Sequence, residues 1–469
     1  MPQVLTLDIA TGARSRRTEP AIGVPRARAD STMLGRVFGR LDEAGIGYCV
    51  LHGYERYPQH VSSDVDCVVA ADALPHRLAA VLRAEAEPLG AEIVQWFHDA
   101  AHFVVLARRE VSGAPSFLQL HAHADCDIDR QTLYSGREVL RGRRRHDVFW
   151  VPEPAVEFAC SLARRIAKGE LRRDHMRRLA ELYQQDQAGC QAQAGRLWGN
   201  ESAGLIARAA ERSEWDDVVR ELRALRAEQN SRALKSNRLR VLRRWTSGMM
   251  RAALRWWRAD RGLSVAFLGP DGCGKSSVVD AVRRNLAPAF VGTERRTFPP
   301  GLLRRATGSN ESPHAQRPRS FLSSSVRAVF YWLTYCTLGH LWLIRPAIAR
   351  GTLVVHDRHL VDALVDPRRY RYGGPAWLLR VIWRLVPKPD LVILLDAPAD
   401  VIQARKQEVS AGETCRQLAA YRRLVSAMPN GHVVDAAMPL EEVVAAVQDL
   451  ILGHLARRAE QQLRLEARP

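Results

Sequence analysis

Lysine is scarce in this sequence, although the chain is strongly basic: only five of its 69 basic residues are lysines. Paired cysteines are also missing, since the eight cysteines are scattered and none forms a Cys-x-x-Cys pair. This spacing argues against a zinc ribbon and favours reduced thiols. The first residues contain no apolar core of a signal peptide, and we therefore expect a cytoplasmic location.

Acidic residues are too few to balance the arginines, and the formal net charge is +18 at pH 7. This charge is compatible with nucleic acid, an anionic membrane surface or phosphorylated ligands as partners. An arginine-biased composition without such a partner explains it equally well, because the charge is spread along the chain. With 469 residues, of which 46% are hydrophobic, we expect two or three domains with cores of their own.

The clearest motif is a glycine-rich segment that follows an apolar run and precedes a helical pattern. It matches Gly-x-x-x-x-Gly-Lys-Ser from Gly269 to Ser276. Glycines allow turns that point backbone N–H groups at phosphates, and the following helix, expected over 276–285, adds the positive end of its dipole. The Lys275 ammonium can reach the β- and γ-phosphates of ATP, and the Ser276 hydroxyl can bind Mg²⁺. The ATP-binding residues expected here are Gly269, Asp271, Gly272, Cys273, Gly274, Lys275, Ser276 and Ser277.

Apolar strands alternate with helical segments after residue 262. We expect strands over 265–268, 353–355, 391–395 and 433–434. This alternation predicts an α/β fold with a parallel sheet that is covered by helices on both faces. Ligands of such sheets bind beyond the carboxyl ends of the strands. The phosphate loop and the pair Asp357-Arg358 follow two of these strands, so we expect them to lie together.

This second half resembles the thymidylate kinases, with a nucleoside monophosphate kinase-like P-loop fold. Four segments carry the resemblance in family order between Leu263 and about Leu455: GPDGCGKSS, VVHDRHLVD, PDLVILLDAPADVIQARK and GHVVDAAMPLEEV. The stretch HDRHLVDALVDPRRYRYGGP is similar to thymidylate kinase-like proteins of bacterial glycan loci, which also carry an N-terminal domain of this kind. The resemblance implies ATP and Mg²⁺ as cofactors and a small phosphorylated molecule as acceptor.

The resemblance also implies residue roles. Asp357 would lie near the metal and the acceptor, Arg358 would hold an acceptor phosphate, and Asp271 would contact the acceptor side. The catalytic residues implied are Lys275, Asp357, Arg358 and Arg405, and the metal ligands are Ser276 and Asp357. The acceptor-binding residues implied are Asp271, Arg358, Arg368 and Arg369.

Two further groups of basic residues have expected roles that the motifs alone do not fix. Arg405 and Lys406, followed by Arg416, fall where the family has a mobile lid, whose cations neutralise charge on the transferred phosphoryl group. The run that contains Arg368 and Arg369 either binds a second phosphate or forms a solvated face.

The first half contains a pair of aspartates, Asp64 and Asp66, on an expected strand over 64–69. Residues two apart on a strand face the same way, and two such carboxylates can hold a divalent metal. The region resembles the nucleotidyltransferase superfamily, whose pattern is Gly-Ser, a loop, Asp-x-Asp and a third acid on a neighbouring strand. Here Tyr54 replaces the serine, and the later strand carries Gln119 and His121 and no acid. We therefore favour a retained α/β fold without catalysis.

We expect six segments along the chain: a disordered tail over 1–31, the nucleotidyltransferase-like domain over 32–150, a helical region over 151–231, a basic linker helix over 232–261, the kinase-like domain over 262–458 and a tail over 459–469. The linker could lie on an anionic membrane or on nucleic acid, but packing between domains is favoured. The uncharged run 328–344 is short for a membrane span, so we expect a core helix beside the sheet and no transmembrane segment.

These features favour an ATP-dependent phosphotransferase that acts on a nucleoside monophosphate or another phosphorylated acceptor. One alternative is a metal-dependent nucleotidyltransferase with a regulatory P-loop domain. The other is a nucleotide-gated binding protein whose basic linker docks on membrane or nucleic acid. A homo-oligomer is compatible with all three, and the identity of the acceptor stays open.

Overall fold

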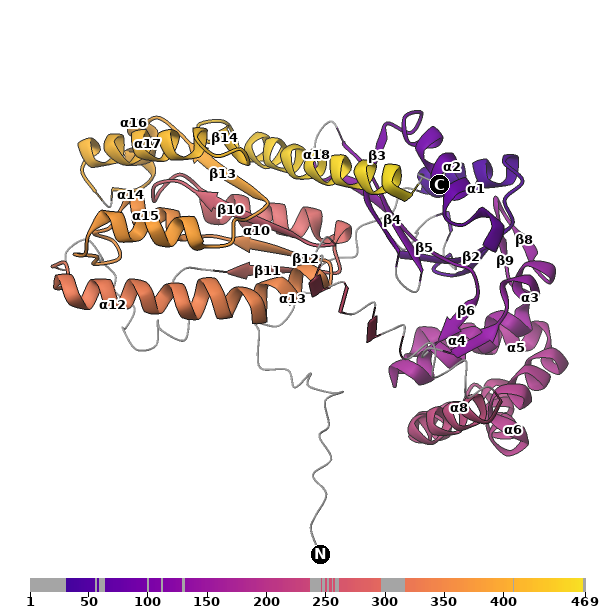
Figure 1. The fold of residues 1–469 in the computed structure, drawn as a ribbon. Coiled ribbons are helices and arrows are strands. Elements are labelled where there is room, and N and C mark those ends of the chain that lie inside the picture. The colour runs from indigo at the N-terminus through magenta and orange to yellow at the C-terminus, as the bar shows by residue number, and fades with distance from the viewer. Residues whose placement is uncertain are drawn as a thin grey trace, which may run out of the picture.

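The computed structural model describes residues 31–466 with several gaps. The gaps are 55–56, 59–63, 99–100, 111–112, 129–130, 297–316 and 408, and within 237–260 only residues 246, 249–250, 253–254 and 256–257 are described. The expected N-terminal tail and most of the expected basic linker therefore lie outside the described residues. Two five-stranded sheets dominate the described part, and a group of helices lies beside the first sheet (Figure 1).

The first sheet is mixed, with the strand order β1-β2-β5-β4-β3. Strands β2 and β5 run parallel, and the other neighbours are antiparallel. The strands are β1 (Tyr48–His52), β2 (Asp64–Val69), β3 (Ala91–His98), β4 (His102–Arg108) and β5 (Ser116–His123). Helices α1 (Ser31–Glu43) and α2 (His76–Ala86) belong to the core on one face, together with Val65 and Cys67 of β2. Because side chains alternate along a strand, Asp66 faces the opposite side of the sheet.

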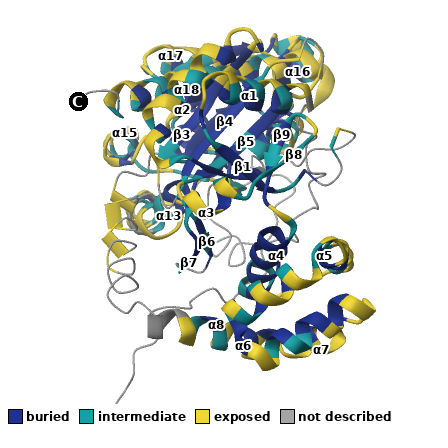
Figure 2. Cartoon of the chain, turned by 90° about the vertical axis from the view of Figure 1, so that its right-hand side faces the viewer, coloured by how far each residue is buried: buried dark blue, intermediate teal, exposed yellow. Residues whose placement is uncertain are grey.

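Short elements connect this sheet to five helices. These short elements are β6 (Cys126–Ile128), β7 (Gln131–Tyr134), α3 (Gly136–Arg141), β8 (Arg144–His146) and β9 (Phe149–Val151), while η1 (Ala71–Ala73) lies between β2 and α2. The helices are α4 (Pro154–Lys168), α5 (Arg173–Gln185), α6 (Gln187–Arg212), α7 (Asp216–Arg220) and α8 (Leu222–Ser236). Figure 2 shows that these helices bury their inner sides and expose their outer sides.

A buried polar contact ties the first sheet to the helices. The Tyr54 hydroxyl donates a hydrogen bond to Glu157 of α4 at 2.6 Å, and Arg178 of α5 contacts the same carboxylate at 2.6 Å. Glu157 is 1% exposed, so its charge requires these partners. The tyrosine that replaces the serine of the nucleotidyltransferase pattern therefore has a structural partner here.

The second sheet is entirely parallel, with the order β11-β12-β10-β13-β14. Its strands are β10 (Leu263–Leu268), β11 (Gly292–Arg296), β12 (Thr352–His356), β13 (Leu391–Asp396) and β14 (Gly431–Asp435). The four expected strands are confirmed as β10, β12, β13 and β14, and the α/β class with a parallel sheet is confirmed with them. Strand β11 was not predicted, because its residues are polar and only half-buried.

Helices surround this sheet. They are α10 (Lys275–Leu286), η2 (Ala287–Ala289), α12 (Phe321–Tyr331), η4 (Trp332–Ile344), α13 (Arg345–Ala349), α14 (Leu360–Val365), α15 (Ala376–Leu385), α16 (Ala399–Arg405), α17 (Ala411–Ser426) and α18 (Leu440–Glu466). Residues 328–344 lie at the end of α12 and in η4, which is π-helical.

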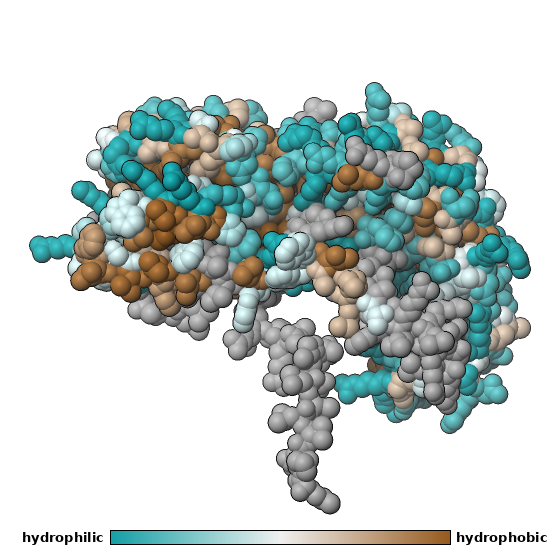
Figure 3. Space-filling model, viewed as in Figure 1, coloured by the Kyte–Doolittle hydropathy of each residue, from teal (hydrophilic) through white to brown (hydrophobic). Residues whose placement is uncertain are grey.

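The expectation of a core helix over 328–344 is only half right. Ile344 is buried against Val354 of β12, as expected for a helix beside the sheet. On the outer side, however, Phe330 and Leu333 are each 48% exposed and Trp342 is 78% exposed. Figure 3 shows hydrophobic residues on the surface around α12. Among the described residues, no helix is both long and apolar enough to cross a membrane.

Helix α18 joins the two sheets (Figure 1). Its Leu455 belongs to the core of the parallel sheet, whereas Ala459 and Leu463 are buried in the core of the mixed sheet. The expectation of a C-terminal tail over 459–469 is therefore wrong up to Glu466, because these apolar side chains find a buried position beside β3.

The free face of the mixed sheet also packs on the parallel-sheet half. Val94, Phe103 and Val105 share one hydrophobic core with residues of β10 and α10. At its edge, the Gln95 side-chain amide donates hydrogen bonds to the carbonyl oxygens of Arg261, at 3.2 Å, and Ala289, at 3.3 Å. The two sheets therefore form one continuous packed structure in the described residues.

Candidate active site

The turn between β10 and α10 has the backbone of a phosphate-binding loop. Gly269, Gly272 and Gly274 have φ angles of 142°, 93° and 89°, which residues with a side chain rarely adopt. A Cβ atom on Gly269 would lie 2.8 Å from the Cys273 sulfur and 2.8 Å from the Leu395 carbonyl oxygen. The loop is therefore closed tightly enough to require glycine, and it leads directly into the N-terminus of α10 at Lys275.

Lys275 lies inside this loop. Its side chain is 9% exposed, and its ammonium donates hydrogen bonds to the carbonyl oxygens of Gly269, at 2.6 Å, and Pro270, at 2.7 Å. The ammonium is 3.9 Å from the Asp271 carboxylate. Cys273 is buried, with its sulfur 3.6 Å from the same nitrogen. The loop thus holds a lysine cation at its centre, where the motif requires it.

Ser276 and Asp357 face the same positive group. The Arg295 guanidinium donates hydrogen bonds to the Ser276 hydroxyl, at 3.2 Å, and to the Asp357 carboxylate, at 2.5 Å. A further bond from Arg295 to Asp280 measures 3.1 Å. A hydroxyl and a carboxylate that share one cation form a donor set that suits Mg²⁺. These two residues therefore fit the metal role that the resemblance implies for them.

Asp271 forms ion pairs with two of the arginines that were expected to bind the acceptor. Its carboxylate is 3.6 Å from the Arg358 guanidinium and forms a close ion pair with Arg369. Arg369 and Asp271 both line a cavity beside the loop, together with Asp366 and Lys406. Arg368, by contrast, is exposed. The described structure thus brings three of the four expected acceptor residues together.

The expected lid cations take different positions. Lys406 packs beside the phosphate loop, where a Cβ on Gly272 would lie 3.1 Å from the lysine Cβ. Arg405 is exposed and donates a hydrogen bond to the Ala436 carbonyl oxygen at 2.9 Å, at the end of β14. Arg416 pairs with Glu413 at 2.6 Å. Arg405 therefore does not join Lys275, Asp357 and Arg358 in this arrangement.

A buried acid, Asp362, follows the expected acceptor residue Arg358 by four positions in the chain. Asp362 accepts hydrogen bonds from the Tyr421 hydroxyl, at 2.6 Å, and from the backbone N–H of His359, at 2.8 Å. Burial raises the pKa of Asp362, and these two donors partly offset that rise. Because Asp362 is hydrogen-bonded both to Tyr421 of α17 and to the N-cap of its own helix, it holds the segment after Arg358 in place.

Sequence reasoning did not find Arg295. Its strand, Gly292–Arg296, contains two adjacent arginines and no alternation of apolar and polar residues. The sequence therefore does not indicate which of the two arginines faces the site. Only the pairing of β11 with β12, which sets Arg296 opposite His356 directly before Asp357, shows that Arg295 reaches Ser276 and Asp357.

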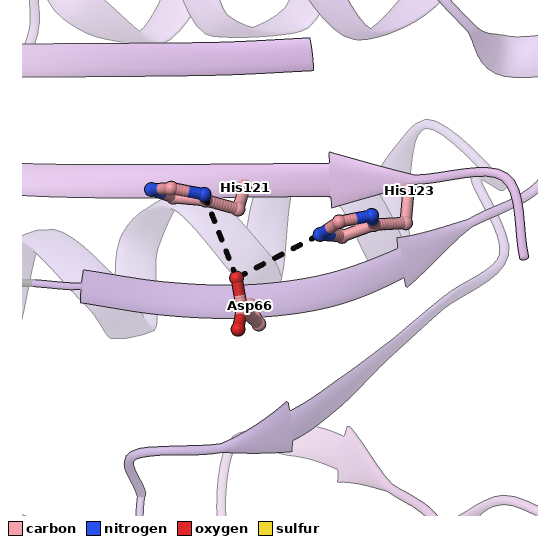
Figure 4. A group of neighbouring side chains, drawn as sticks. All are labelled: Asp66, His121 and His123. Carbon is pink, nitrogen blue, oxygen red and sulfur yellow. Dashed lines mark ion pairs between the residues drawn. The ribbon is translucent and has the colours of Figure 1, made fainter. Parts of the chain in front are cut away.

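A second polar cluster lies on the mixed sheet. Asp66 of β2 faces His121 and His123 of β5 (Figure 4). Its other carboxylate oxygen contacts His52 and Arg164. Burial raises the pKa of Asp66, but His123, His52 and Arg164 outweigh it and hold this pKa well below its usual range. The side chain of Asp64 lies outside the described part.

The register of the mixed sheet agrees with the absence of a third acid on the neighbouring strand. In the parallel pair of β2 and β5, Asp64 lies opposite Gln119 and Asp66 lies opposite His121. His52, His123 and Arg164 were not singled out from the sequence. For His123 a signal existed, since it follows His121 by two residues on one strand and must share its face.

Comparisons with known proteins agree with the geometry of the parallel-sheet half. A thymidylate kinase family model matches residues 267–447. A probable thymidylate kinase of Pyrobaculum aerophilum is 29% identical over 200 residues, which cover 40% of this chain and 95% of that protein. The thymidylate kinase of Thermomicrobium roseum is 30% identical over 200 residues, or 39% of this chain and 91% of that protein.

A third relative is the thymidylate kinase of Xanthomonas campestris pv. campestris (strain B100), 28% identical over 212 residues, which cover 42% of this chain and 86% of that protein. The family match begins within β10, so the mixed sheet and the helices beside it lie outside it. Through its parallel-sheet half, with its phosphate loop, the chain belongs to the thymidylate kinase family and is a P-loop kinase.

Proposed function

We propose that the parallel-sheet half transfers the γ-phosphoryl group of ATP to a nucleoside monophosphate or another phosphorylated acceptor. The observation that carries this proposal is the position of Asp271. It extends from the phosphate loop and pairs with two arginines, Arg358 and Arg369, so that donor and acceptor groups meet at one edge of the sheet. Such positioning supplies much of the catalysis of phosphoryl transfer.

On the donor side, each residue has one task. Bound ATP supplies the phosphoryl group, and Mg²⁺ offsets the charge on its phosphate oxygens. Lys275 exchanges the carbonyl oxygens of Gly269 and Pro270 for phosphate oxygens, and the turn N–H groups bind the rest of the phosphate chain. Ser276 and Asp357 would hold the metal, and Arg295 would then have to leave these two residues, because the guanidinium and Mg²⁺ are both cations.

On the acceptor side, Arg358 and Arg369 bind the phosphate of the acceptor. A guanidinium can bind two phosphate oxygens at once, and this fixes both the position and the orientation of the acceptor. Asp271 keeps the two arginines in place and limits the positive charge of the site before the acceptor binds. Lys406, beside the loop, would neutralise charge on the transferred group, whereas Arg405 and Arg416 would first have to leave the Ala436 carbonyl oxygen and Glu413.

A screen with the purified chain tests this function. ADP release from ATP is measured against a panel of nucleoside monophosphates, thymidylate first, and of phosphorylated sugars. We expect ADP release that depends on one class of acceptor and disappears in Lys275→Ala. Release of pyrophosphate instead of ADP would favour the nucleotidyltransferase alternative. Salt-sensitive binding to lipid or DNA without any turnover would favour the nucleotide-gated binding protein.

For the mixed sheet, we propose a nucleotidyltransferase-like fold without nucleotidyl transfer. The parallel pairing of β2 with β5 and the position of Asp66 support the fold. The lack of an acid on β5 argues against transfer that depends on two metal ions, because such sites require several carboxylates.

A further inference from the structure

The cluster on the mixed sheet has the donor set of a metal site. His121 and His123 belong to one strand, β5, and Asp66 belongs to its parallel neighbour β2 (Figure 4). One ligand atom from each of the three residues lies within 4.8 Å of the other two. The three side chains therefore converge on one point at the surface of the sheet.

We propose that Asp66, His121 and His123 bind a divalent transition-metal ion such as Zn²⁺, Fe²⁺ or Co²⁺. The Asp66 Oδ1 atom is 3.6 Å from His121 Nδ1 and 3.7 Å from His123 Nε2. Hydrogen bonds of this type measure about 2.7–3.2 Å, so both distances are long for direct bonds. Ligands at about 2.1 Å from a tetrahedral metal lie about 3.4 Å from one another, which small side-chain rotations would reach.

The second carboxylate oxygen of Asp66, Oδ2, is bound by His52 and Arg164. His52 Nε2 is 2.6 Å from Asp66 Oδ2, and the Arg164 guanidinium of α4 contacts both of them closely. Metal-binding carboxylates are commonly oriented by such second partners. Because Oδ2 is already occupied, Asp66 presents Oδ1 to the two histidines, as a carboxylate ligand with a single free oxygen would.

The donor types decide which metals fit. Imidazole suits zinc, iron, cobalt, nickel and copper, whereas magnesium and calcium prefer oxygen donors alone. His121 and His123 have side chains that are 33% and 20% exposed, so the site is open to solvent on one side. Water or an anionic oxygen ligand can complete the coordination there, favoured by the positive charge of Arg164. This site is separate from the phosphate loop, and the proposal does not depend on the kinase reaction.

Metal titration of the untagged full chain, freed of metal by chelation, tests the proposal. Co²⁺ is followed by its visible absorption and Zn²⁺ by calorimetry. We expect one ion per chain, with affinity lowered at least about tenfold in His121→Gln, in His123→Gln and in Asp66→Asn, and about 10- to 100-fold in Arg164→Gln. The control His76→Gln changes an exposed histidine of the same half and should bind like the unchanged protein.

Two outcomes would overturn the proposal. One is the absence of stoichiometric binding of Co²⁺ and Zn²⁺. The other is a metal affinity that stays the same in His121→Gln and in His123→Gln, even if it falls in Asp66→Asn. Circular dichroism confirms that each variant is folded. If a variant does not fold, the proposal is tested on the unchanged protein alone. Zn²⁺ must then raise its melting temperature, and bound Co²⁺ must show the visible absorption of a site with nitrogen ligands.

Discussion

Each of the two sheets brings an aspartate against an arginine, and the two pairs differ in what surrounds them. In the parallel sheet, Asp357 contacts Arg295, which also binds the Ser276 hydroxyl beside the phosphate loop. In the mixed sheet, Asp66 contacts Arg164 and faces two histidines. Oxygen donors suit Mg²⁺, and imidazole donors suit transition metals. The neighbours of the acid, more than its place on a strand, therefore determine which ion it can bind.

The turns beside the two acids differ as well. After β10 the chain uses three glycines with positive φ to form a loop around Lys275. After β1 the corresponding turn has Gly53 and then Tyr54, whose hydroxyl is bound to the buried Glu157. The first turn is shaped for phosphate, whereas the second is part of the contact with the helical region.

The largest effect is expected from Lys275→Ala. This change removes the only cation at the centre of the described phosphate loop, and we expect turnover to fall on the order of 10³-fold. The far-ultraviolet circular dichroism should be unchanged, since the described contacts of the ammonium are all to groups of its own loop. Undiminished ADP release would move the active site away from the parallel sheet.

The next largest effect is expected from Arg358→Ala. We expect acceptor-dependent turnover to fall about 10²-fold, because the acceptor phosphate loses its position, while ATP binding persists. Arg380→Ala, which changes an exposed arginine on α15, is the matched control and should keep full activity. Loss of ATP binding in Arg358→Ala would contradict its assignment to the acceptor side. Binding of a fluorescent ATP analogue measures the donor side, and steady-state kinetics with varied acceptor measures the acceptor side.

A smaller effect is expected from Arg295→Gln. In the proposed site Arg295 and Mg²⁺ would compete for Ser276 and Asp357, and a partly exposed ion pair contributes about 1 kcal/mol. Removing it should lower the Mg²⁺ concentration at half-maximal activity about fivefold. The measurement is turnover against Mg²⁺ at fixed ATP. A higher requirement for Mg²⁺ in the variant would show that Arg295 supports the metal and does not compete with it.

The smallest effect on phosphoryl transfer is expected from Asp64→Asn combined with Asp66→Asn. The two acids lie on the other sheet, and distant independent sites act additively, so turnover should change less than about twofold. The same variant should lose the transition metal. A dead double variant together with an active Arg358→Ala would reverse the comparison and place catalysis on the mixed sheet.

Local patterns were sufficient for much of the parallel sheet. The phosphate loop, the four buried strands and Asp357 after β12 follow from glycine spacing and from apolar runs that alternate with helices. They could be predicted because each depends on residues close together in the chain. Arg295 could not be predicted, because its strand is polar and its position depends on pairing with β12, which is distant in the sequence.

The same limit explains the errors. The apolar run 328–344 predicts a core helix beside the sheet, but among its described side chains Ile344 packs against the sheet whereas Leu333 and Trp342 are exposed. The segment 459–466 lacks the apolar density of a core helix, and its burial depends on the mixed sheet, which packs where α18 continues. Periodicity shows that a helix forms, whereas its burial depends on a partner that the local pattern does not contain.

By itself, the sequence determined the chemistry of this protein: a phosphate loop with its lysine, an acid–arginine pair after a strand, and two aspartates two residues apart. Tertiary structure alone decided which groups face one another. The pairing of β2 with β5 opposes Asp66 to His121, and α4 adds Arg164 from a helix far along the chain. The physical reason is that side-chain identity and strand alternation are local, whereas ion pairs and metal ligands require distances of a few ångströms between segments that only folding brings together.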